Sequence, residues 1–298
     1  MMGTALVTGL SGFTGRYVAR ELEALGYEVV GLEQGSTLDT AHSGLDLRDG
    51  PRLTEYVAAL QPRVVIHLAA IAFVAHGDVS DMYTSNIVGT RNLLAALAAC
   101  DTAPEKVLLA SSANVYGNAN VATLDENCPA QPENDYAVSK YAMELMARQW
   151  RTQLPIVIVR PFNYTGVGQA GAFLLPKLVD HFARGEARVE LGNIDVYRDF
   201  NDVRVVAAAY ARLLDKGVPG EVYNVCSGRA YSIKDVLALL ADLAGYSIEV
   251  DINPAFVRAN EVKKLVGSNR KLAAAIGELE LIPLADTLEW MFRAKTSA

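Results

Sequence analysis

Short apolar runs alternate with longer amphipathic stretches through the first half of the chain, and this alternation constrains the fold more than any other feature. The apolar runs have the length and composition of buried strands: residues 4–7, 28–32, 64–68, 106–110 and 156–159. The stretches between them have helical periodicity: residues 13–25, 53–60, 82–99 and 136–150. Strands joined by helices run parallel, because each right-handed crossover returns the chain to the same edge of the sheet. The sequence therefore predicts an α/β fold with a doubly wound parallel sheet.

The second half of the chain departs from this rhythm after residue 161. Glycines and prolines punctuate residues 166–176, and a helix, a strand at 188–191 and a helix at 203–214 follow. Residues 221–226 are expected to form the last strand of the sheet, because their valines and tyrosine suit a buried pleated position. From Ser227 onward we expect mostly helix. Two domains are predicted: a sheet domain of residues 1–161 and 193–226, and a smaller C-terminal lobe of residues 162–192 and 227–298.

Composition and charge exclude several classes of function. A net charge of -7 argues against nucleic acid as a partner, because the summed field repels phosphates. The apolar stretches are too short or too interrupted for a membrane span, and the N-terminus lacks the basic start and cleavage site of a signal peptide. Three widely spaced cysteines and four scattered histidines predict neither disulfides nor a metal site. We expect a cytoplasmic protein without a metal.

A glycine-rich turn follows the first predicted strand directly and leads into a helix at Phe13. Its glycines are Gly9, Gly12 and Gly15. Glycines in a strand–turn–helix context let backbone amides approach a pyrophosphate at the helix N-terminus, and the third lets the helix pack closely on the sheet. The turn therefore predicts a site for NAD(H) or NADP(H), and the sheet domain is expected to bind this dinucleotide. The alternative is a tight turn with a purely structural role.

Two later acidic positions favour one cofactor over the other. Glu33 closes the second predicted strand, where a carboxylate can accept both hydroxyls of the adenosine ribose and repel a 2′-phosphate. This favours NAD(H) modestly, although Arg16 could instead pair with the phosphate of NADP(H). Asp46 is placed to accept the exocyclic amine of the adenine, and Leu47 to cover a face of the ring. Asp46 could also be a helix cap or a turn residue.

Tyr136 and Lys140 lie one helical turn apart and are the candidate acid–base pair. A phenol with a pKa of about 10 is a poor acid–base catalyst at neutral pH unless a nearby cation favours the phenolate. Such a pair can arise by chance, but Ser111 and Ser112 follow the fourth predicted strand. At the carboxyl end of a parallel strand these hydroxyls face a bound ligand. Together the three features predict a site that moves a proton to or from a substrate oxygen.

The combination of these motifs resembles the extended short-chain dehydrogenase/reductases, the NAD-dependent family of nucleotide-sugar epimerases, dehydratases and reductases with a Rossmann sheet. The resemblance spans the whole chain. It rests on these segments: Thr8-Gly9-x-x-Gly12-x-x-Gly15, His67-Leu68-Ala69-Ala70, Asn86-x-x-Gly89-Thr90, Ser111-Ser112-x-x-Val115-Tyr116-Gly117, Tyr136-x-x-x-Lys140 and Arg160-Pro161-Phe162-Asn163. Segments around Asp199, Asn224 and Arg258 are most similar to the branch that handles GDP-mannose derivatives.

The resemblance implies roles for individual residues. Ser112 would bind the C4 oxygen of the sugar, Tyr136 would donate the proton, and Lys140 would tune Tyr136 and bind the nicotinamide ribose. Contacts to the cofactor are implied for Leu68, Ala69 and Ala70. Contacts to the substrate are implied for Asn114, Asn163, Lys177, Arg198, Arg258 and Glu261. For some of these residues the alternative is a role outside substrate binding: the arginines could be solvated surface charges, and Asn163 could cap a turn.

The residues after Ser112 separate two reactions of the family. A 4,6-dehydratase needs an acid–base carboxylate beside the serine, to take a proton from C5 and deliver one to the leaving group at C6. Here Ala113 and Asn114 occupy those positions. The lack of a carboxylate favours reduction of a C4 keto group. The resemblance implies that the substrate is a nucleotide-linked 4-keto-6-deoxyhexose, GDP-4-keto-6-deoxy-mannose being converted to GDP-rhamnose. Alternatives are a nucleotide-sugar 4-epimerase, a 4-ketoreductase of a UDP- or dTDP-sugar, a 4,6-dehydratase, and a non-catalytic NAD-binding sensor.

The helices predicted at 82–99 and 136–150 are rich in alanine and leucine beyond one buried stripe. In the family such helices pair across a two-fold axis, which implies a homodimer held by a four-helix bundle. The alternative is that they only cover the sheet.

Overall fold

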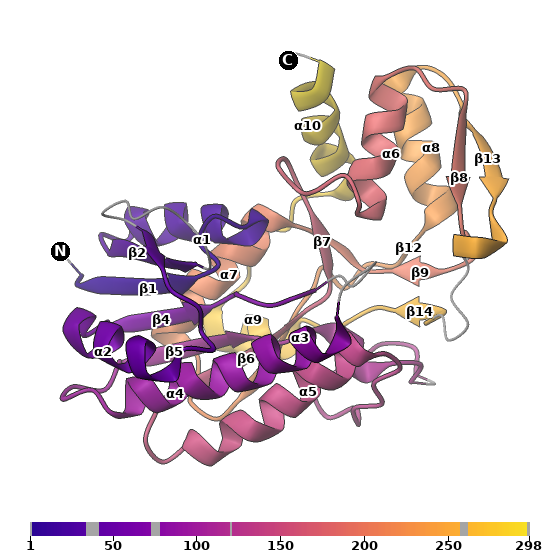
Figure 1. Cartoon of the computed structure of the whole chain (residues 1–298). Coiled ribbons are helices and arrows are strands. Elements are labelled where there is room, and N and C mark those ends of the chain that lie inside the picture. The colour runs from indigo at the N-terminus through magenta and orange to yellow at the C-terminus, as the bar shows by residue number, and fades with distance from the viewer. Residues whose placement is uncertain (1, 34–41, 73–77, 120, 257–261, 297–298) are drawn as a thin grey trace.

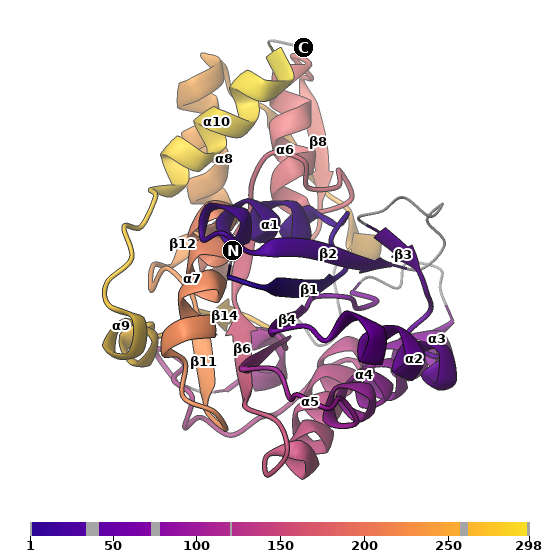
Figure 2. The ribbon, with the colours of Figure 1, turned by 90° about the vertical axis from the view of Figure 1, so that its left-hand side faces the viewer.

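The computed structural model describes residues 2–33, 42–72, 78–119, 121–256 and 262–296. A seven-stranded sheet with the strand order β11-β6-β5-β4-β1-β2-β3 forms its centre, and every pair of neighbouring strands is parallel (Figures 1 and 2). The strands are β1 (Thr4–Thr8), β2 (Glu28–Glu33), β3 (His42–Gly44), β4 (Val64–His67), β5 (Lys106–Ala110), β6 (Ile156–Pro161) and β11 (Val222–Val225). The predicted doubly wound α/β fold is confirmed. Strand β3 was not predicted, because three residues without an apolar pattern become a strand only by pairing with β2.

Helices cover both faces of the sheet. Helices α1 (Phe13–Ala24) and α7 (Val203–Lys216) pack with one face around Val18, Leu22 and Val206. Helices α2 (Gly50–Leu60), α4 (Thr90–Ala98) and α5 (Asp135–Ala147) bury their apolar sides in the core on the other face. In Figure 1, α4 and α5 run along the lower side of the sheet. Each helix buries one apolar stripe against the sheet, as the periodicity predicts.

The stretch predicted as one helix at 82–99 is interrupted by a wider turn. It begins as α3 (Val79–Tyr83), continues as the π-helical segment η1 (Thr84–Gly89) and ends as α4. In η1 the buried Asn86 accepts from Ile71 N (2.9 Å) and donates to Ser139 Oγ (3.0 Å). Periodicity cannot reveal one extra residue in a helical turn, and such turns occur often at functional sites. Helix α5 likewise ends at Ala147 in the 3₁₀ segment η3 (Arg148–Trp150).

A second group of elements lies beside the carboxyl edge of the sheet, at the upper right of Figure 1. Helices α6 (Leu174–Ala183), α8 (Ile233–Ala244) and α10 (Leu284–Thr296) share a core with β8 (Arg188–Leu191). Strand β8 pairs in parallel with β13 (Glu249–Ile252). Short strands link this lobe to the sheet: β7 (Asn163–Thr165), β9 (Tyr197–Arg198), β10 (Phe200–Asp202), β12 (Tyr231–Ser232) and β14 (Lys264–Leu265).

The C-terminal region is less purely helical than predicted, because β12, β13 and β14 find partners far away in sequence. A 3₁₀ turn, η4 (Pro254–Phe256), follows β13. Helix α9 (Arg270–Ile276) packs Leu272 and Ile276 into the core of the sheet, although its sequence lies within the segment assigned to the second lobe. The division into two domains stays a prediction.

In the described part of the chain, no helix is long and apolar enough to cross a membrane. Cys100, Cys128 and Cys226 are free thiols. No group of three or more His, Cys, Asp and Glu side chains that could hold a metal ion occurs among the described residues.

Candidate active site

The turn between β1 and α1 leaves little or no room for a side chain at its three glycines. Gly9 has a φ of +74°, a conformation that L side chains rarely adopt, and its amide donates to Leu32 O. A Cβ on Gly15 would lie 2.3 Å from Gly9 O and 2.4 Å from Leu10 O. Gly12 caps α1 without a side-chain hydrogen bond, so the first amides of the helix have no side-chain acceptor. A helix start without a side-chain cap, beside closely packed glycines, fits a pyrophosphate, as the sequence predicts.

The end of β4 is locked to the end of β1 beside this turn. Thr8 Oγ accepts from Leu68 N (3.2 Å) and Ala69 N (3.1 Å). His67 lies buried between the hydroxyls of Thr8 (2.7 Å) and Thr90 (2.8 Å). Burial, helped by the charge of Lys140, lowers the pKa of His67 to about 3, so this imidazole stays neutral. The half-buried Leu68, Ala69 and Ala70 continue from this point along the carboxyl edge of the sheet.

Glu33 ends β2, and its carboxylate accepts a hydrogen bond from Ser11 N in the glycine turn. Arg16 also faces this turn, since its Nε donates to Ser11 O (2.8 Å). Both groups that could distinguish NAD(H) from NADP(H) therefore lie at one corner of the turn.

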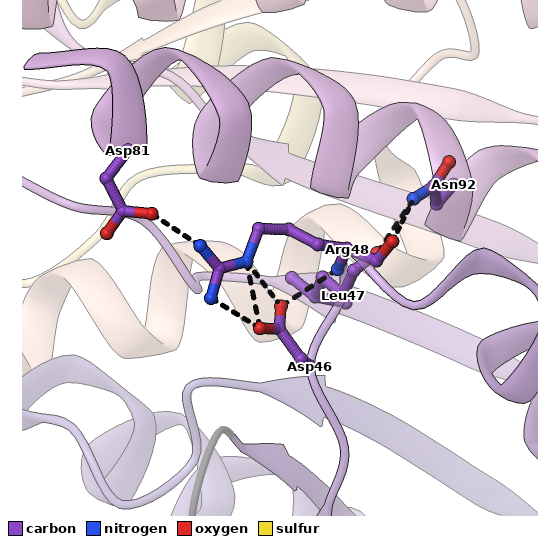
Figure 3. Close-up of polar contacts among 5 residues, drawn as sticks. All are labelled: Asp46, Leu47, Arg48, Asp81 and Asn92. Atoms are coloured by element: carbon purple, nitrogen blue, oxygen red, sulfur yellow. Dashed lines mark hydrogen bonds and ion pairs between the residues drawn. The ribbon is translucent and has the colours of Figure 1, made fainter.

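Asp46 lies in a polar cluster between the sheet and α3 (Figure 3). Its carboxylate accepts from Arg48 N (2.9 Å) and forms an ion pair with the Arg48 guanidinium (2.5 Å), which also contacts Asp81 at the start of α3. The hydrogen bonds from Arg48 hold the pKa of Asp46 below its usual range. Leu47 O accepts from Asn92 Nδ2 (3.0 Å), and the Leu47 side chain packs on Gly89. An adenine amine at Asp46 would therefore share the carboxylate with Arg48.

Ser112, Tyr136 and Lys140 converge at the carboxyl end of β5. Ser112 is buried at the start of the 3₁₀ segment η2 (Ala113–Tyr116), and its hydroxyl accepts from Asn114 N (3.2 Å) and lies close enough to the Tyr136 side chain to lower the pKa of that phenol, against the larger effect of burial. Asn134 caps α5 by accepting from Ala137 N (2.9 Å), which fixes the turn that carries Tyr136. Lys140 is buried, and its Nζ donates to Ala110 O (2.7 Å). The structure thus brings together the three residues that the sequence predicts for proton transfer.

Burial sets the protonation of this group. Loss of solvent raises the pKa of the Tyr136 phenol, so it holds its proton at neutral pH. The same effect lowers the pKa of Lys140 to about 8, while the nearby Glu144 carboxylate opposes that fall. The phenol therefore holds its proton but is a weaker acid than a free tyrosine, so its donation of that proton needs a nearby cation, for which Lys140, cationic below about pH 8, is the candidate.

A buried ion pair that no sequence motif predicted lies beside these residues. Glu144 on α5 accepts from Arg160 Nε (2.9 Å) and Nη2 (2.6 Å) and from Ser111 Oγ (2.5 Å). Arg160 also lies 4.8 Å over the ring of Tyr116, whose hydroxyl donates to Asn224 Oδ1 (2.7 Å). The sequence contains one indication of Glu144, which is its spacing: Tyr136, Lys140 and Glu144 follow one another at intervals of one helical turn and so share a helix face.

Tyr164 on β7 is a second residue that the sequence analysis did not place in the site. Its ring stacks on Phe13 (centroids 6.0 Å apart), and its hydroxyl is hydrogen-bonded to Thr14 Oγ (2.8 Å). It also acts electrostatically on Tyr136. Tyr164 thus joins the start of α1 to the strand that leads into the second lobe.

The residues with implied substrate contacts are spread along the boundary between sheet and lobe. Asn114 is half-buried in η2, and Asn163 is exposed at the start of β7. Lys177 on α6 donates to Glu190 O (2.7 Å) and lies 5.2 Å from the centroid of the Phe256 ring. Arg198 on β9 donates to Tyr197 O (2.9 Å). Two further predicted contacts, Arg258 and Glu261, lie outside the described residues.

Comparison with known proteins defines the family. Residues 5–226 match the model of the NAD dependent epimerase/dehydratase family. The chain belongs to this family. The match runs from the first strand of the sheet to the end of β11, and so includes the glycine turn and all three converging residues.

Two curated relatives extend the similarity to nearly the full length. The chain is 34% identical to the GDP-6-deoxy-D-talose 4-dehydrogenase of Aggregatibacter actinomycetemcomitans, over 91% of this chain and 90% of the relative. It is 37% identical to the GDP-6-deoxy-D-mannose reductase of Pseudomonas aeruginosa, over the same shares of the two chains.

Solved structures agree with the fold. A crystal structure of a candidate epimerase from Burkholderia cenocepacia J2315 is 54% identical with a TM-score of 0.93, and covers 99% of this chain and 98% of that one. The structure of RMD from Pseudomonas aeruginosa complexed with NADPH is 34% identical with a TM-score of 0.85, over 99% and 98%. The chain is therefore an NAD(P)-dependent member of the epimerase/dehydratase family with a Rossmann sheet, and the predicted class of cofactor is confirmed.

Proposed function

We propose that this family member reduces the C4 keto group of GDP-4-keto-6-deoxy-mannose with NAD(P)H and forms GDP-rhamnose. The observation that carries the proposal is the set of Ser112, Tyr136 and Lys140 without a carboxylate at the two positions after Ser112. Those positions hold the buried Ala113 and the half-buried Asn114.

The chemistry follows from the protonation of these side chains. NAD(P)H, when bound, supplies a hydride for C4. The Ser112 and Tyr136 hydroxyls hold the C4 oxygen, and the Tyr136 Oη–H bond breaks as its proton moves to that oxygen. Cationic Lys140, one turn along α5, stabilises the phenolate that remains. Burial raises the pKa of Tyr136, so the phenol holds its proton before the reaction and depends on the Lys140 cation to release it.

Dehydration requires a catalytic group that Ser112, Tyr136 and Lys140 do not provide. Removing the C5 proton and expelling the C6 hydroxyl requires a second acid–base group close to the sugar. An alanine has no such group, and a side-chain amide is too weak an acid and too weak a base to move these protons near neutral pH. The family would place the carboxylate of a 4,6-dehydratase at these two positions. Its absence there argues against a 4,6-dehydratase function.

The names of the two relatives support a GDP-linked 6-deoxyhexose as substrate. They also favour a second candidate, because 6-deoxytalose and 6-deoxymannose differ only in configuration at C4. The same residues would reduce the same ketone to GDP-6-deoxy-talose if the sugar presented its other face to the cofactor. The reaction type is common to both candidates, and the orientation of the sugar distinguishes them.

For the cofactor, the Glu33 carboxylate at the end of β2 supports a modest preference for NAD(H), because its charge repels a 2′-phosphate. The NADPH in the Pseudomonas aeruginosa structure and the position of Arg16 support the other form. We retain NAD(H) as the proposed preference, to be tested by substitution of Glu33.

We also propose a homodimer formed by α4 and α5 of two copies. Apolar side chains on this side of the molecule are exposed in the single chain, with Val88 at 44%, Val138 at 37% and Leu145 at 43%. A two-fold axis beside them would bury these side chains in a four-helix bundle.

A binding screen and a turnover assay test the proposed function. Ligand binding raises the melting temperature in proportion to the logarithm of ligand concentration over Kd, so GDP should stabilise the protein more than UDP or dTDP at equal concentration. Incubation with GDP-mannose and NAD should leave the sugar unchanged. Formation of a 4-keto-6-deoxy sugar would refute the reductase proposal, and preferential stabilisation by UDP or dTDP would refute the choice of nucleotide.

A further inference from the structure

We propose that Glu144 is a positioning residue of this site: its buried carboxylate keeps Lys140 cationic and fixes the segment that carries Ser112. The proposal deepens the proposed reduction, and only its kinetic test rests on that function. Glu144 touches neither substrate nor cofactor in this account, since it acts through its two neighbours.

The geometry places Glu144 where three structural elements meet. Its side chain is fully buried, and that of its partner Arg160 is 5% exposed. One carboxylate oxygen accepts from Ser111 Oγ (2.5 Å) and Arg160 Nε (2.9 Å), and the other from Arg160 Nη2 (2.6 Å). Glu144 therefore ties α5 to the ends of β5 and β6, and Ser111 directly precedes Ser112.

The charge of Glu144 acts on Lys140, and the Arg160 guanidinium bound to the same carboxylate offsets part of it. Burial is the main influence on Lys140, and Glu144 is the one charged group that opposes it. From β4, the facing group is His67, which stays neutral because burial lowers its pKa to about 3. From β5, Lys140 donates to the carbonyl of Ala110; on its own helix the phenol of Tyr136, one turn earlier, is neutral because burial raises its pKa.

A buried ion pair is a weak source of stability, because desolvation of two charges offsets most of their attraction. A purely structural role for Glu144 would be served as well by apolar side chains of similar volume. Glu144 lies one helical turn after Lys140. An anion at this position favours the ammonium form of Lys140, which an apolar side chain cannot do.

The test measures the titration of Lys140 directly in the full-length protein. An amine reacts with acetic anhydride only when it is unprotonated, so the extent of Lys140 labelling against pH, read by mass spectrometry, gives its midpoint. The wild-type midpoint should lie at about 8. In Glu144→Gln it should fall by about one pH unit or more, because an opposite charge at this range shifts a pKa by that amount.

Matched variants separate charge from structure. Glu221→Gln makes the same chemical change in the partly exposed ion pair with Lys271 and should leave the Lys140 midpoint unchanged. Glu144→Asp retains the charge and should restore a midpoint near the wild-type value. If Glu144→Gln does not fold, the double variant Glu144→Gln/Arg160→Gln removes both charges of the ion pair and should show a fall in the same direction, smaller because the Arg160 cation is lost as well. An unchanged midpoint in the folded variant would overturn the proposal.

A kinetic experiment then links the electrostatic role to the reaction. In Glu144→Gln the loss of kcat for ketone reduction at high pH should begin at a lower pH, by the shift that labelling measures, with little change in KM. A labelling shift in a protein that reduces no GDP-4-keto-6-deoxyhexose would refute the proposed function and leave the role of Glu144 standing. A labelling shift without a matching kinetic shift in an active enzyme would overturn its role in the reaction.

Discussion

The glycine turn gives the sharpest prediction, because the space around Gly15 is defined by backbone atoms. In Gly15→Ala the new Cβ would lie 2.3 Å from Gly9 O and 2.4 Å from Leu10 O, far inside ordinary van der Waals contact. Neither oxygen belongs to a flexible side chain, so the turn itself must open. Overpacking of this kind costs about 1–3 kcal/mol or more.

That distortion falls on the amides that would meet the pyrophosphate of the cofactor. We expect the Kd for NADH or NADPH to rise about tenfold or more, which corresponds to about 1.4 kcal/mol. Titration of nicotinamide fluorescence measures the Kd, and thermal unfolding measures the stability of each variant.

Gly171→Ala is the matched control. A Cβ on Gly171 meets nothing within 4 Å, so this variant should bind the cofactor and unfold as the wild type does. A Gly15→Ala protein with the wild-type Kd and melting temperature would show that α1 does not pack on the turn as described, and would refute the reasoning.

Other predictions concern the reacting residues, the cofactor and the assembly. Tyr136→Phe should lower kcat about 10²–10⁴-fold, the usual contribution of a general acid, while the cofactor Kd stays unchanged; a small effect in a steady-state assay would exclude Tyr136 as the proton donor. Because burial lowers the pKa of Lys140 to about 8, kcat for reduction should be constant below that pH and fall about tenfold per unit above it. A flat profile to pH 10 would contradict a cationic role for this lysine. Glu33→Gln should improve the Kd for NADPH relative to NADH, and an unchanged ratio would mean that other groups choose the cofactor. Val138→Glu with Leu145→Glu should yield a monomer in size-exclusion chromatography if these residues lie in a dimer interface, while an unchanged elution volume would refute that interface.

The alternation of strands and helices was sufficient to predict the sheet, because burial on two faces requires continuous apolar strands and amphipathic helices between them. The strands that the sequence did not reveal depend on distant partners. His42–Gly44 becomes β3 only beside β2, and Lys264–Leu265 becomes β14 only beside β9. The π-helical turn at Thr84–Gly89 is set by contacts of Asn86 with Ile71 and Ser139, which no periodicity contains.

The site shows the same division between local and distant information. Ser112, Tyr136 and Lys140 could be predicted because each lies at a position fixed by a strand end or a helical turn. The pairing of Glu144 with Arg160 joins α5 to β6, and the sequence gives no means to tell a buried carboxylate from a solvated one. For Asp46, the sequence predicts a carboxylate available to the adenine amine. The structure shows that Arg48, two residues later, already forms an ion pair with this carboxylate.

The central claim is that this chain reduces a keto group at C4 and does nothing else to the sugar. The most direct measurement is the product formed from GDP-4-keto-6-deoxy-mannose with NADH or NADPH, followed by nicotinamide absorbance and identified by NMR spectroscopy. We expect one equivalent of cofactor to be oxidised for each ketone consumed, with GDP-rhamnose as the product. Interconversion of nucleotide sugars at C4 without net oxidation of the cofactor would instead identify an epimerase.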